Sequence, residues 1–182
     1  SVGPPLNGVR VIIVDDTDRE LPAGEIGEIC IKGPNVMQGY LKLPEATAEA
    51  IKDGWFYTGD IGRVDEDGYV YILDRKKDMI IVGGLNVYPR EIEDCLLRHP
   101  RVAEAAVIGI PEELRGEVPL ALVVLKAGAT TAEELILYCR RMLANFKCPR
   151  QVFFVDSLPK TATGKVDKKQ LRKQYNVINP GS

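Results

Sequence analysis

Apolar residues in the first seventy positions recur in short runs that are typical of β-strands. Residues 9–15 (VRVIIVD) and 25–33 (EIGEICIKG) are rich in β-branched side chains, and a turn region containing Pro, Gly and Asp separates them. Residues 69–74 (YVYILD) alternate directly after an Asp67-Gly68 turn. The pattern therefore predicts an all-β, small β-barrel-like piece over residues 1–74.

From residue 75 onward the pattern changes to mixed helices and strands. The first predicted helix begins at Pro89 and ends before Pro100. Its inward positions follow helical spacing: Ile92, Cys95, Leu96 and His99. Two strands are predicted next, at 102–110 and at 118–126.

A second helix is predicted after Thr131, because Thr131 and Glu134 have the spacing of a capping box. Its expected inward positions are Leu135, Cys139, Met142 and Leu143. Residues 153–155 predict another strand, and Asp167 with Gln170 can cap a last, basic helix. The fold class is therefore α+β: the β-rich piece is followed by a compact domain, residues 75–182, with a short sheet flanked by helices.

The charged run DRKKD at 74–78 separates these two pieces. A cluster of charges between two strand-like runs is typical of a solvated turn. Exposed polar residues at an element boundary can also absorb a large φ/ψ change without breaking a core, which is what a hinge requires. The pattern leaves both interpretations open.

Composition narrows the class of protein. With 45% hydrophobic and 27% charged residues, the chain can bury a core and keep a charged surface, which excludes a disordered or fibrous protein. A net charge of -2 gives no general attraction to nucleic acid or to an anionic membrane. Any anion-binding site must therefore be local. The abrupt start on strand-like sequence suggests a piece of a longer chain.

The cysteines and the histidine predict no metal site. The four cysteines form no C-x-x-C pair and His99 is the only histidine, so buried, reduced thiols are expected. The longest apolar runs, VRVIIVD and LALVVL, are too short to span a bilayer, and no secretory signal is present. We therefore expect a soluble, cytoplasmic protein without a transmembrane segment.

Two stretches in the middle of the chain have more glycine and polar residues than a structural role requires. In DGWFYTGDIG at 53–62, Asp60 on a glycine turn can accept both hydroxyls of a ribose or simply form the turn. Gly83 and Gly84, between a predicted strand and a helix, either let the backbone approach a ligand or turn the chain. Arg75 offers a planar donor for hydroxyl or phosphate oxygens, although exposed arginines commonly have no such role.

A third stretch, LPKTATGKVD at 158–167, ends like a phosphate-binding loop. A Walker-type loop needs a glycine where this chain has Pro159 and a Ser or Thr where it has Val166. Proline offers no N–H and valine cannot bind Mg²⁺, so this interpretation fails. Lys165 is then either a solvated lysine or a point charge for a phosphate or carboxylate oxygen.

Taken in order, YTGD, DRKKDMIIVGGLNVYPREIE and LPKTATGK resemble the adenylate-forming enzyme superfamily, specifically the acyl-CoA synthetases. The three motifs extend over residues 53–170, and the β-rich opening is similar to the last part of the family's large N-terminal domain. The resemblance implies that residues 1–74 end that domain and that residues 75–182 form the mobile C-terminal domain, with a hinge near 75–78. The phosphate loop and adenine-binding motif that the family carries earlier do not occur here, so we interpret the chain as a C-terminal fragment.

The resemblance also implies a function. Members use ATP to convert a carboxylic acid into an acyl-adenylate and then transfer the acyl group to CoA, while the C-terminal domain rotates between the two steps. ATP with Mg²⁺ would be bound mainly by the missing N-terminal part, which would be this chain's partner domain. The fragment alone would be inactive, and the sequence gives no indication of oligomeric state.

The family's functional residues map onto nine positions of this sequence. The resemblance makes Asp60 and Arg75 the ribose-binding pair, Lys165 the catalytic lysine of adenylation, and Lys77 the hinge. It assigns the pantetheine tunnel and CoA contacts to Gly83, Gly84, Phe146, Lys147 and Arg150, and no metal ligand to this chain.

Alternatives remain at this point. The overall resemblance favours a medium- or long-chain fatty acid, but acetyl, aryl and amino-acid substrates stay open, the last with a carrier-protein thiol as acceptor. A non-catalytic nucleotide- or CoA-binding module of the same fold is a second class. Nucleic-acid binding by the basic helix around Lys168, Lys169, Arg172 and Lys173 is disfavoured, because no aromatic platform accompanies it.

Overall fold

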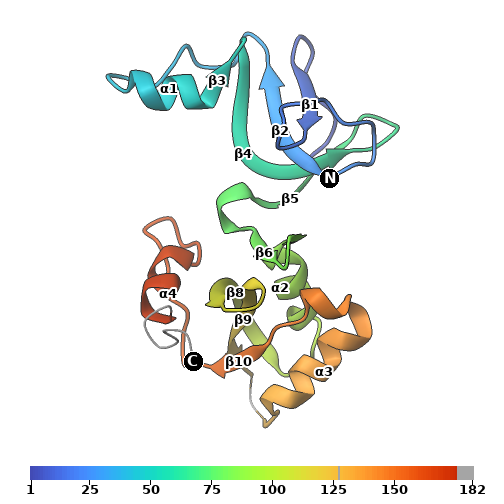
Figure 1. The fold of residues 1–182 in the computed structure, drawn as a ribbon, viewed down its shortest axis with the longest axis vertical. Coiled ribbons are helices and arrows are strands. Elements are labelled where there is room, and N and C mark those ends of the chain that lie inside the picture. Colours follow the sequence, from blue (N-terminus) through green and yellow to red (C-terminus); the bar gives the residue numbers. More distant parts are fainter. Residues whose placement is uncertain (127, 176–182) are drawn as a thin grey trace. The chain divides into compact units, whose positions relative to one another are not determined.

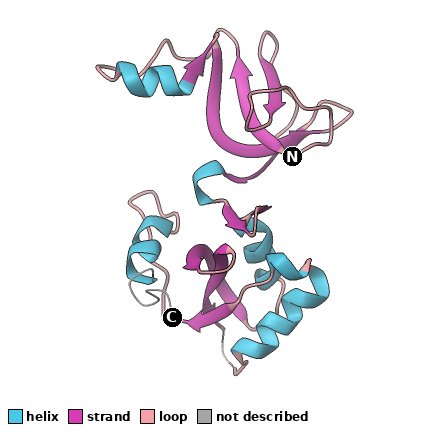
Figure 2. Ribbon diagram, in the orientation of Figure 1, coloured by secondary structure: helices cyan, strands magenta, loops and turns pink. Residues whose placement is uncertain are grey.

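The structure, a computed structural model, describes residues 1–126 and 128–175. Two compact units divide the chain, one from Ser1 to Lys77 and one from Asp78 onward. Each unit contains its own five-stranded sheet (Figures 1 and 2). The α+β fold class is therefore confirmed.

The first unit is built on an antiparallel sheet in which a long, bent strand, β4, pairs with three neighbours (Figure 1). The strands are β1 (Arg10–Val14), β2 (Gly27–Lys32), β3 (Ile51–Lys52), β4 (Trp55–Val64) and β5 (Val70–Arg75). Their order is β1-β2-β4-β3, with β5 also paired to β4. Three of these strands, β1, β2 and β5, lie where the sequence pattern predicted them.

Two features of this unit differ from the prediction. The segment 53–62, expected as an aromatic-rich stretch closing on a turn, is mostly strand β4. The prediction of an all-β piece is wrong at α1 (Pro44–Ala50). This seven-residue helix buries no residue, so it has no amphipathic pattern to detect, and only Pro44 at its first turn and its alanines indicate it.

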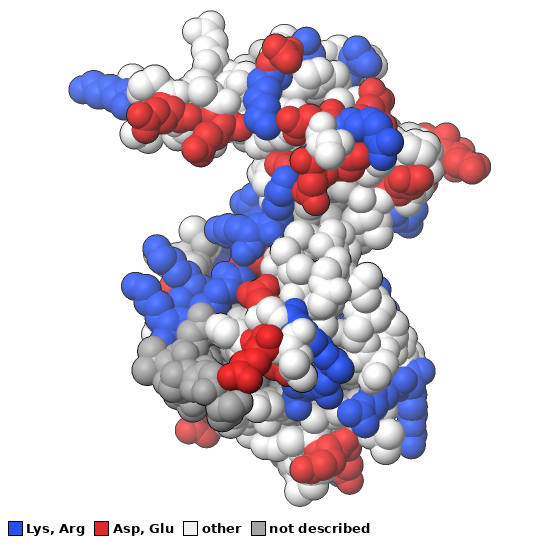
Figure 3. All heavy atoms as spheres, in the orientation of Figure 1, with Lys and Arg blue, Asp and Glu red and all other residues white. Residues whose placement is uncertain are grey.

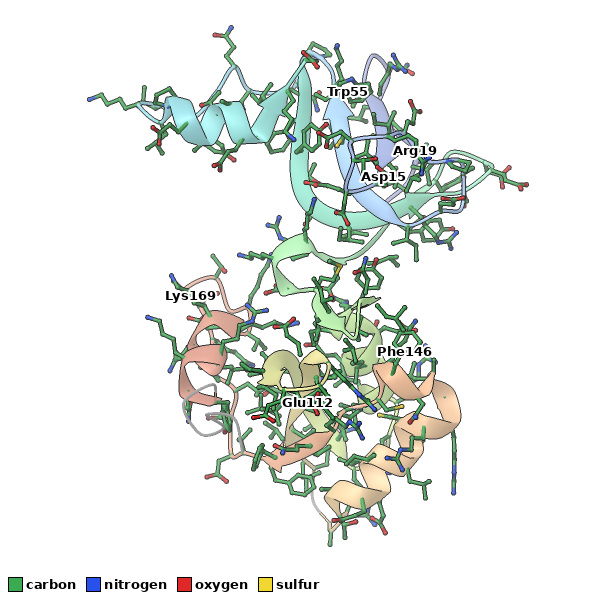
Figure 4. All side chains as sticks on the ribbon, viewed as in Figure 1. Asp15, Arg19, Trp55, Glu112, Phe146 and Lys169 are labelled. Atoms are coloured by element: carbon green, nitrogen blue, oxygen red, sulfur yellow. The ribbon has the colours of Figure 1, made fainter. Side chains whose placement is uncertain are left out.

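An apolar cluster of the first unit lies on one face of its sheet. Alternate residues of a strand point to the same face, so Ile13 and Ile29 come together with Val70. On a different part of the sheet, the Trp55 ring lies within cation–π distance of Arg10 and Lys32, at 5.4 and 5.7 Å (Figure 4).

The second unit contains a mixed sheet. Its strands are β6 (Ile80–Val82), β7 (Leu85–Val87), β8 (Val102–Glu112), β9 (Gly116–Leu125) and β10 (Gln151–Phe154). The order is β10-β9-β6-β7, and β8 pairs with β9 along most of its length. All pairs are antiparallel except the β10–β9 pair.

Helices cover both faces of this sheet (Figure 2). The helices are α2 (Pro89–Leu97), α3 (Ala132–Met142) and α4 (Lys168–Tyr175). Along β8, Val107 packs with α2 and α3, whereas Ala106 and Ile108 pack with Leu171 of α4. The period of two along the strand therefore separates two apolar clusters and sets one or more helices on each.

The predicted caps of α3 and α4 are confirmed. The Glu134 N–H donates to the Thr131 hydroxyl at 3.2 Å, and the Glu134 carboxylate accepts from the Thr131 N–H at 3.1 Å. The Gln170 N–H donates to Asp167 at 2.9 Å. Two predicted details are wrong: Met142 is 54% exposed, and His99 lies beyond the end of α2 at Leu97. Residues at a helix end leave the buried stripe first, which periodicity alone does not show.

The four cysteines are buried free thiols, as predicted. Burial raises the pKa of Cys30 to about 12 and raises the pKa of Cys95, Cys139 and Cys148 above the ordinary value. In the part of the chain that the structure describes, no helix has both the length and the apolar character needed to cross a membrane.

Candidate functional site

A β-bulge in the first unit displays Asp60. The register of β4 against β2 shifts next to this position, and Gly59 has φ +69°, a left-handed conformation that glycine adopts without strain. The Thr58 hydroxyl donates to the carbonyl of Ile29 at 2.8 Å and accepts from the Asp60 N–H at 3.0 Å. These bonds fix the backbone on both sides of Gly59.

Asp60 and Arg75, the predicted ribose-binding pair, lie opposite each other on β4 and β5. The Arg75 guanidinium is 3.0 Å from the Asp60 carboxylate and also donates to the carbonyl of Thr58 at 3.2 Å. The Arg75 side chain is 52% exposed and the Asp60 side chain is 28% exposed. An accessible acceptor beside an accessible planar donor can together bind vicinal hydroxyl groups.

Glu28, which was not predicted from the sequence, holds this bulge through a hydrogen bond to its backbone. Among the described residues, it is the one charged residue that is buried. Its carboxylate accepts from the Gly59 N–H at 3.0 Å and from the Lys76 ammonium at 2.9 Å. The hydrogen bond from Lys76 to this carboxylate raises the Lys76 pKa. A glutamate between apolar neighbours in a buried strand was the available signal, because such a residue needs partners.

Gly83 and Gly84 form the exposed tip of the hairpin that joins β6 to β7, so the prediction that they lie between a strand and a helix is wrong. The strand β7 was not predicted, because three residues are too few to show an alternating pattern. Both glycines have positive φ, +57° and +84°, and a Cβ added at either would meet nothing within 4 Å. The Gly83 N–H donates to the carbonyl of Arg115 at 2.8 Å, which holds the tip in place.

Phe146, Lys147 and Arg150 lie in and after a 3-10 turn, η2 (Asn145–Lys147), with Phe146 visible beside α3 in Figure 4. The Lys147 ammonium contacts both carboxylate oxygens of Glu91, at 2.9 and 2.7 Å. Arg150 is exposed. An incoming phosphate at Lys147 would have to compete with Glu91 for the ammonium.

Lys165 lies on a tight, hydrogen-bonded loop directly before α4. The Thr161 N–H donates to the Lys165 carbonyl at 2.7 Å, and the Gly164 N–H donates to the Thr161 carbonyl at 2.9 Å. Gly164 has φ +79°. The backbone is thus fixed while the Lys165 side chain is exposed, and among the described residues it forms no ion pair. Basic side chains also gather over the neighbouring α4 (Figure 3).

The predicted residues are divided between the two units. Asp60, Arg75 and Lys77 belong to the first unit. The glycine tip, the η2 residues and Lys165 belong to the second. No group of three or more His, Cys, Asp or Glu side chains in the described residues is suited to a metal ion.

Comparisons with known proteins agree with this arrangement. A family model described as AMP-binding enzyme matches residues 1–41, and one described as AMP-binding enzyme C-terminal domain matches residues 91–165. The chain is 49% identical over 172 residues to a long-chain-fatty-acid–CoA ligase of Escherichia coli O6:H1, covering 94% of this chain and 31% of the ligase. It is also 49% identical over 174 residues to a 2-succinylbenzoate–CoA ligase of Geobacillus kaustophilus, covering 95% and 35%.

Solved structures of MatB from Rhodopseudomonas palustris match in two states. The ATP-bound crystal structure has a TM-score of 0.92 at 48% identity, covering 98% of this chain and 36% of MatB. The apo structure, at the same 48% identity and covering 97% and 36%, has a TM-score of 0.70. The two TM-scores differ at the same identity and nearly the same coverage.

The fold and the order of the motifs agree with the matched family models. The chain belongs to the AMP-binding enzyme family. The resemblance carried by the three sequence motifs is therefore confirmed at the level of the family. The chain spans about a third of the length of the curated relatives it matches, 31% for the E. coli ligase.

Proposed function

We propose that this chain is the C-terminal part of an ATP-dependent acid–CoA ligase, which activates a carboxylic acid as an acyl-adenylate and transfers the acyl group to CoA. The observation that carries the proposal is the Asp60–Arg75 pair on the hydrogen-bonded bulge of β4, in a chain that belongs to the AMP-binding enzyme family. In this proposal residues 1–74 end the N-terminal adenylation domain, and residues 75–182 form the mobile C-terminal domain.

Asp60 and Arg75 have the chemistry to hold the ribose of ATP. The carboxylate can accept from both ribose hydroxyls, and the guanidinium can orient the carboxylate and donate to a hydroxyl oxygen. Both side chains are accessible, and hydrogen bonds of the Thr58 hydroxyl hold the bulge beneath them. In this proposal the ATP phosphates and Mg²⁺ are bound mainly by the rest of the enzyme.

Lys165 is proposed as the catalytic cation of the adenylation step. As the substrate carboxylate attacks the α-phosphorus of ATP, negative charge grows on the phosphate oxygens, and pyrophosphate leaves. An ammonium on a fixed loop can stabilise that charge without reorganising the backbone. Its exposure and its lack of an ion pair among the described residues leave it available for this role.

The thioester step is assigned to the second unit. The glycine tip at Gly83 and Gly84 offers a backbone surface without side chains, which suits passage of the narrow pantetheine arm. Phe146, Lys147 and Arg150 supply an aromatic ring and two cations of the kind that bind the nucleotide end of CoA. Lys147 would exchange its Glu91 partner for a CoA phosphate.

A change of domain orientation between the two steps is part of the proposal, with Lys77 as the hinge. The different TM-scores of the ATP-bound and apo structures of MatB, 0.92 and 0.70, support it. The alternation would present Lys165 in the first step and the glycine tip in the second.

A medium- or long-chain fatty acid is our proposal for the substrate, supported by the names of several relatives, including the E. coli ligase. A 2-succinylbenzoate–CoA ligase is equally similar at 49% identity, so the common substrate class is a carboxylic acid. In this proposal the residues that contact the acid belong to the rest of the enzyme. The proposed location is the cytoplasm, where ATP and CoA are available.

The proposal is tested by replacing Lys165 with Ala in the full-length enzyme and measuring the two steps separately. Carboxylate-dependent pyrophosphate release should fall by about a hundredfold or more, because one electrostatic contact in a closed site commonly has that effect. Conversion of preformed acyl-adenylate to the thioester should stay within about twofold. Lys169→Ala, an exposed lysine on α4 (Figure 4), is the matched control and should leave both steps unchanged.

Equal activity of the wild type and Lys165→Ala in both assays would reject the role of Lys165. Binding of ATP or CoA by the wild type without turnover of any carboxylic acid would favour the non-catalytic module. Turnover with a carrier-protein thiol but not with CoA would identify the amino-acid- or aryl-activating alternative.

A further inference from the structure

The unit boundary falls inside a single 3-10 turn, η1 (Lys76–Asp78). The three residues of this turn differ in the ion pairs that they form. Lys76 is bound to a side chain of the first unit, and Asp78 is bound to a side chain of the second. Lys77 lies between them, is exposed, and forms no ion pair with any described residue.

On the side of the first unit, the attachment is the ion pair of Lys76 with Glu28. The ammonium lies 2.9 Å from a carboxylate that is only 9% exposed. A carboxylate held in that environment needs its cation, because loss of the partner would leave a nearly buried charge without compensation. Asp16, 78% exposed and 3.5 Å away, adds a weaker contact.

On the side of the second unit, the attachment is the ion pair of Asp78 with Arg172 of α4, at 2.7 Å. The Asp78 side chain is 13% exposed and that of Arg172 is 29% exposed. The helix itself is held by a second pair, Lys168 with Glu93 at 2.8 Å, whose side chains are 15% and 13% exposed. Asp78 is therefore bound to an element that is fixed within its own unit.

We propose that the ion pairs Glu28–Lys76 and Asp78–Arg172 confine the bending of the chain to Lys77, so that Glu28 and Arg172 act as positioning residues for the hinge. The inference rests on the proposed function in one respect: the bending at Lys77 would serve the rotation between the two catalytic steps. The two attachments stand on the geometry of each unit alone. A change of orientation then uses essentially the backbone dihedrals at one residue.

The same carboxylate links this hinge to the nucleotide site. Glu28 accepts from the Gly59 N–H, directly before Asp60, as well as from Lys76. The bulge that displays the ribose-binding carboxylate and the last attached residue before the hinge thus share one buried acceptor. Lys76, directly before the proposed hinge residue, is therefore held by the same carboxylate as the bulge of the proposed nucleotide site.

Limited proteolysis with an endoproteinase that cleaves after lysine tests the inference in the intact enzyme that contains this chain. Cleavage requires a lysine to leave its own partners and enter the protease. In the wild type we expect cleavage after Lys77 and little after Lys76, because the Lys76 ammonium is bound to Glu28. Glu28→Gln should raise cleavage after Lys76 by about five- to tenfold, since a hydrogen bond between charged groups is lost.

Arg172→Met should raise cleavage after Lys77 by a similar factor and leave Lys76 protected, whereas Arg172→Lys, which keeps a cation, should restore most of the protection. The matched controls remove exposed ion pairs elsewhere: Asp18→Asn in the first unit, partner of Lys52, and Glu104→Gln in the second, partner of Lys160. Neither control should change either cleavage rate.

The inference is overturned if Glu28→Gln leaves the ratio of the two cleavages unchanged, or if Arg172→Met does not accelerate cleavage after Lys77. It is also overturned if the variants accelerate cleavage equally at lysines throughout the chain, since that would indicate general unfolding. The assay uses no ATP, acid or CoA. Its result is therefore independent of whether the ligase assays with Lys165→Ala succeed.

Discussion

At the scale of single residues, Asp60 has a partner and still faces solvent. Its ion pair with Arg75 orients the carboxylate, but 28% of the side chain is exposed and can meet a ligand. A residue with this exposure contributes little to folding, because a solvent-exposed ion pair stabilises a protein only weakly. Loss of Asp60 should therefore appear in nucleotide binding before it appears in stability.

Asp60→Ala in the full-length enzyme should raise the KM for ATP by about tenfold or more, because hydrogen bonds to a charged acceptor are lost. Steady-state kinetics at saturating acid and CoA measure this effect. Asp18→Ala, which removes another exposed carboxylate of the same unit, is the control. A KM for ATP within about twofold of the wild type would contradict the assignment of Asp60 to the ribose.

Residue chemistry could be predicted from the sequence only where a residue acts alone. The position of Lys165 on an exposed loop was predicted from the sequence, and its catalytic role stays a prediction. Glu28 acts through Gly59 and Lys76, which are 31 and 48 residues away in the sequence. Its role depends on the pairing of β2 with β4, and no local pattern contains that information.

At the scale of elements, the glycine hairpin between β6 and β7 is a place where effects on stability and on activity can be distinguished. Gly83 and Gly84 have positive φ, but a Cβ there would meet nothing within 4 Å. A substitution therefore strains the backbone by about 1 kcal/mol without displacing a neighbour. A large effect on activity would have to come from a ligand.

Gly84→Ala should slow conversion of preformed acyl-adenylate to the thioester by at least about tenfold and leave pyrophosphate release within about twofold. The expected cause is a methyl group in the path of the pantetheine thiol. Gly68→Ala is the matched control, because Gly68 has φ +81°, close to the +84° of Gly84, and equally open space.

The thermal unfolding midpoints of the two glycine variants should shift by similar amounts. Equal slowing of both half-reactions in Gly84→Ala would indicate a distorted hairpin and would reject the tunnel assignment.

Elements were predictable where local chemistry and burial agree. The helix α3 has both a capping box and a buried stripe, and its start was predicted correctly. The helix α1 has no buried residue, and β7 has three residues, so neither has enough pattern to detect. The strand β4 was obscured because its bulge at Gly59 interrupts the alternation of apolar residues.

At the scale of the whole molecule, the two units have unequal cores. Among the described residues, the cluster in the first unit contains three buried residues, whereas the two clusters of the second contain fourteen and eight. Apolar burial is the main stabilising contribution to a fold. The second unit should consequently resist denaturant better.

The single tryptophan, Trp55, lies in the first unit, whereas α2, α3 and α4 lie in the second. During urea unfolding of the chain, tryptophan fluorescence should change at a midpoint about 1 M or more below that of the helical circular dichroism signal. Trp55→Phe should abolish the fluorescence change and leave the later circular dichroism transition in place. Coincident transitions would show that the two units unfold together.

The burial of the four cysteines has a practical consequence for following such motions. Every native cysteine sulfur is buried, and burial raises each thiol pKa, to about 12 for Cys30. Maleimide reagents attack thiolates, which these sites scarcely form at neutral pH. A cysteine introduced on the surface of each unit would thus be labelled selectively with a fluorophore. Because the four native cysteines would not react, the distance between two such fluorophores could be recorded during turnover.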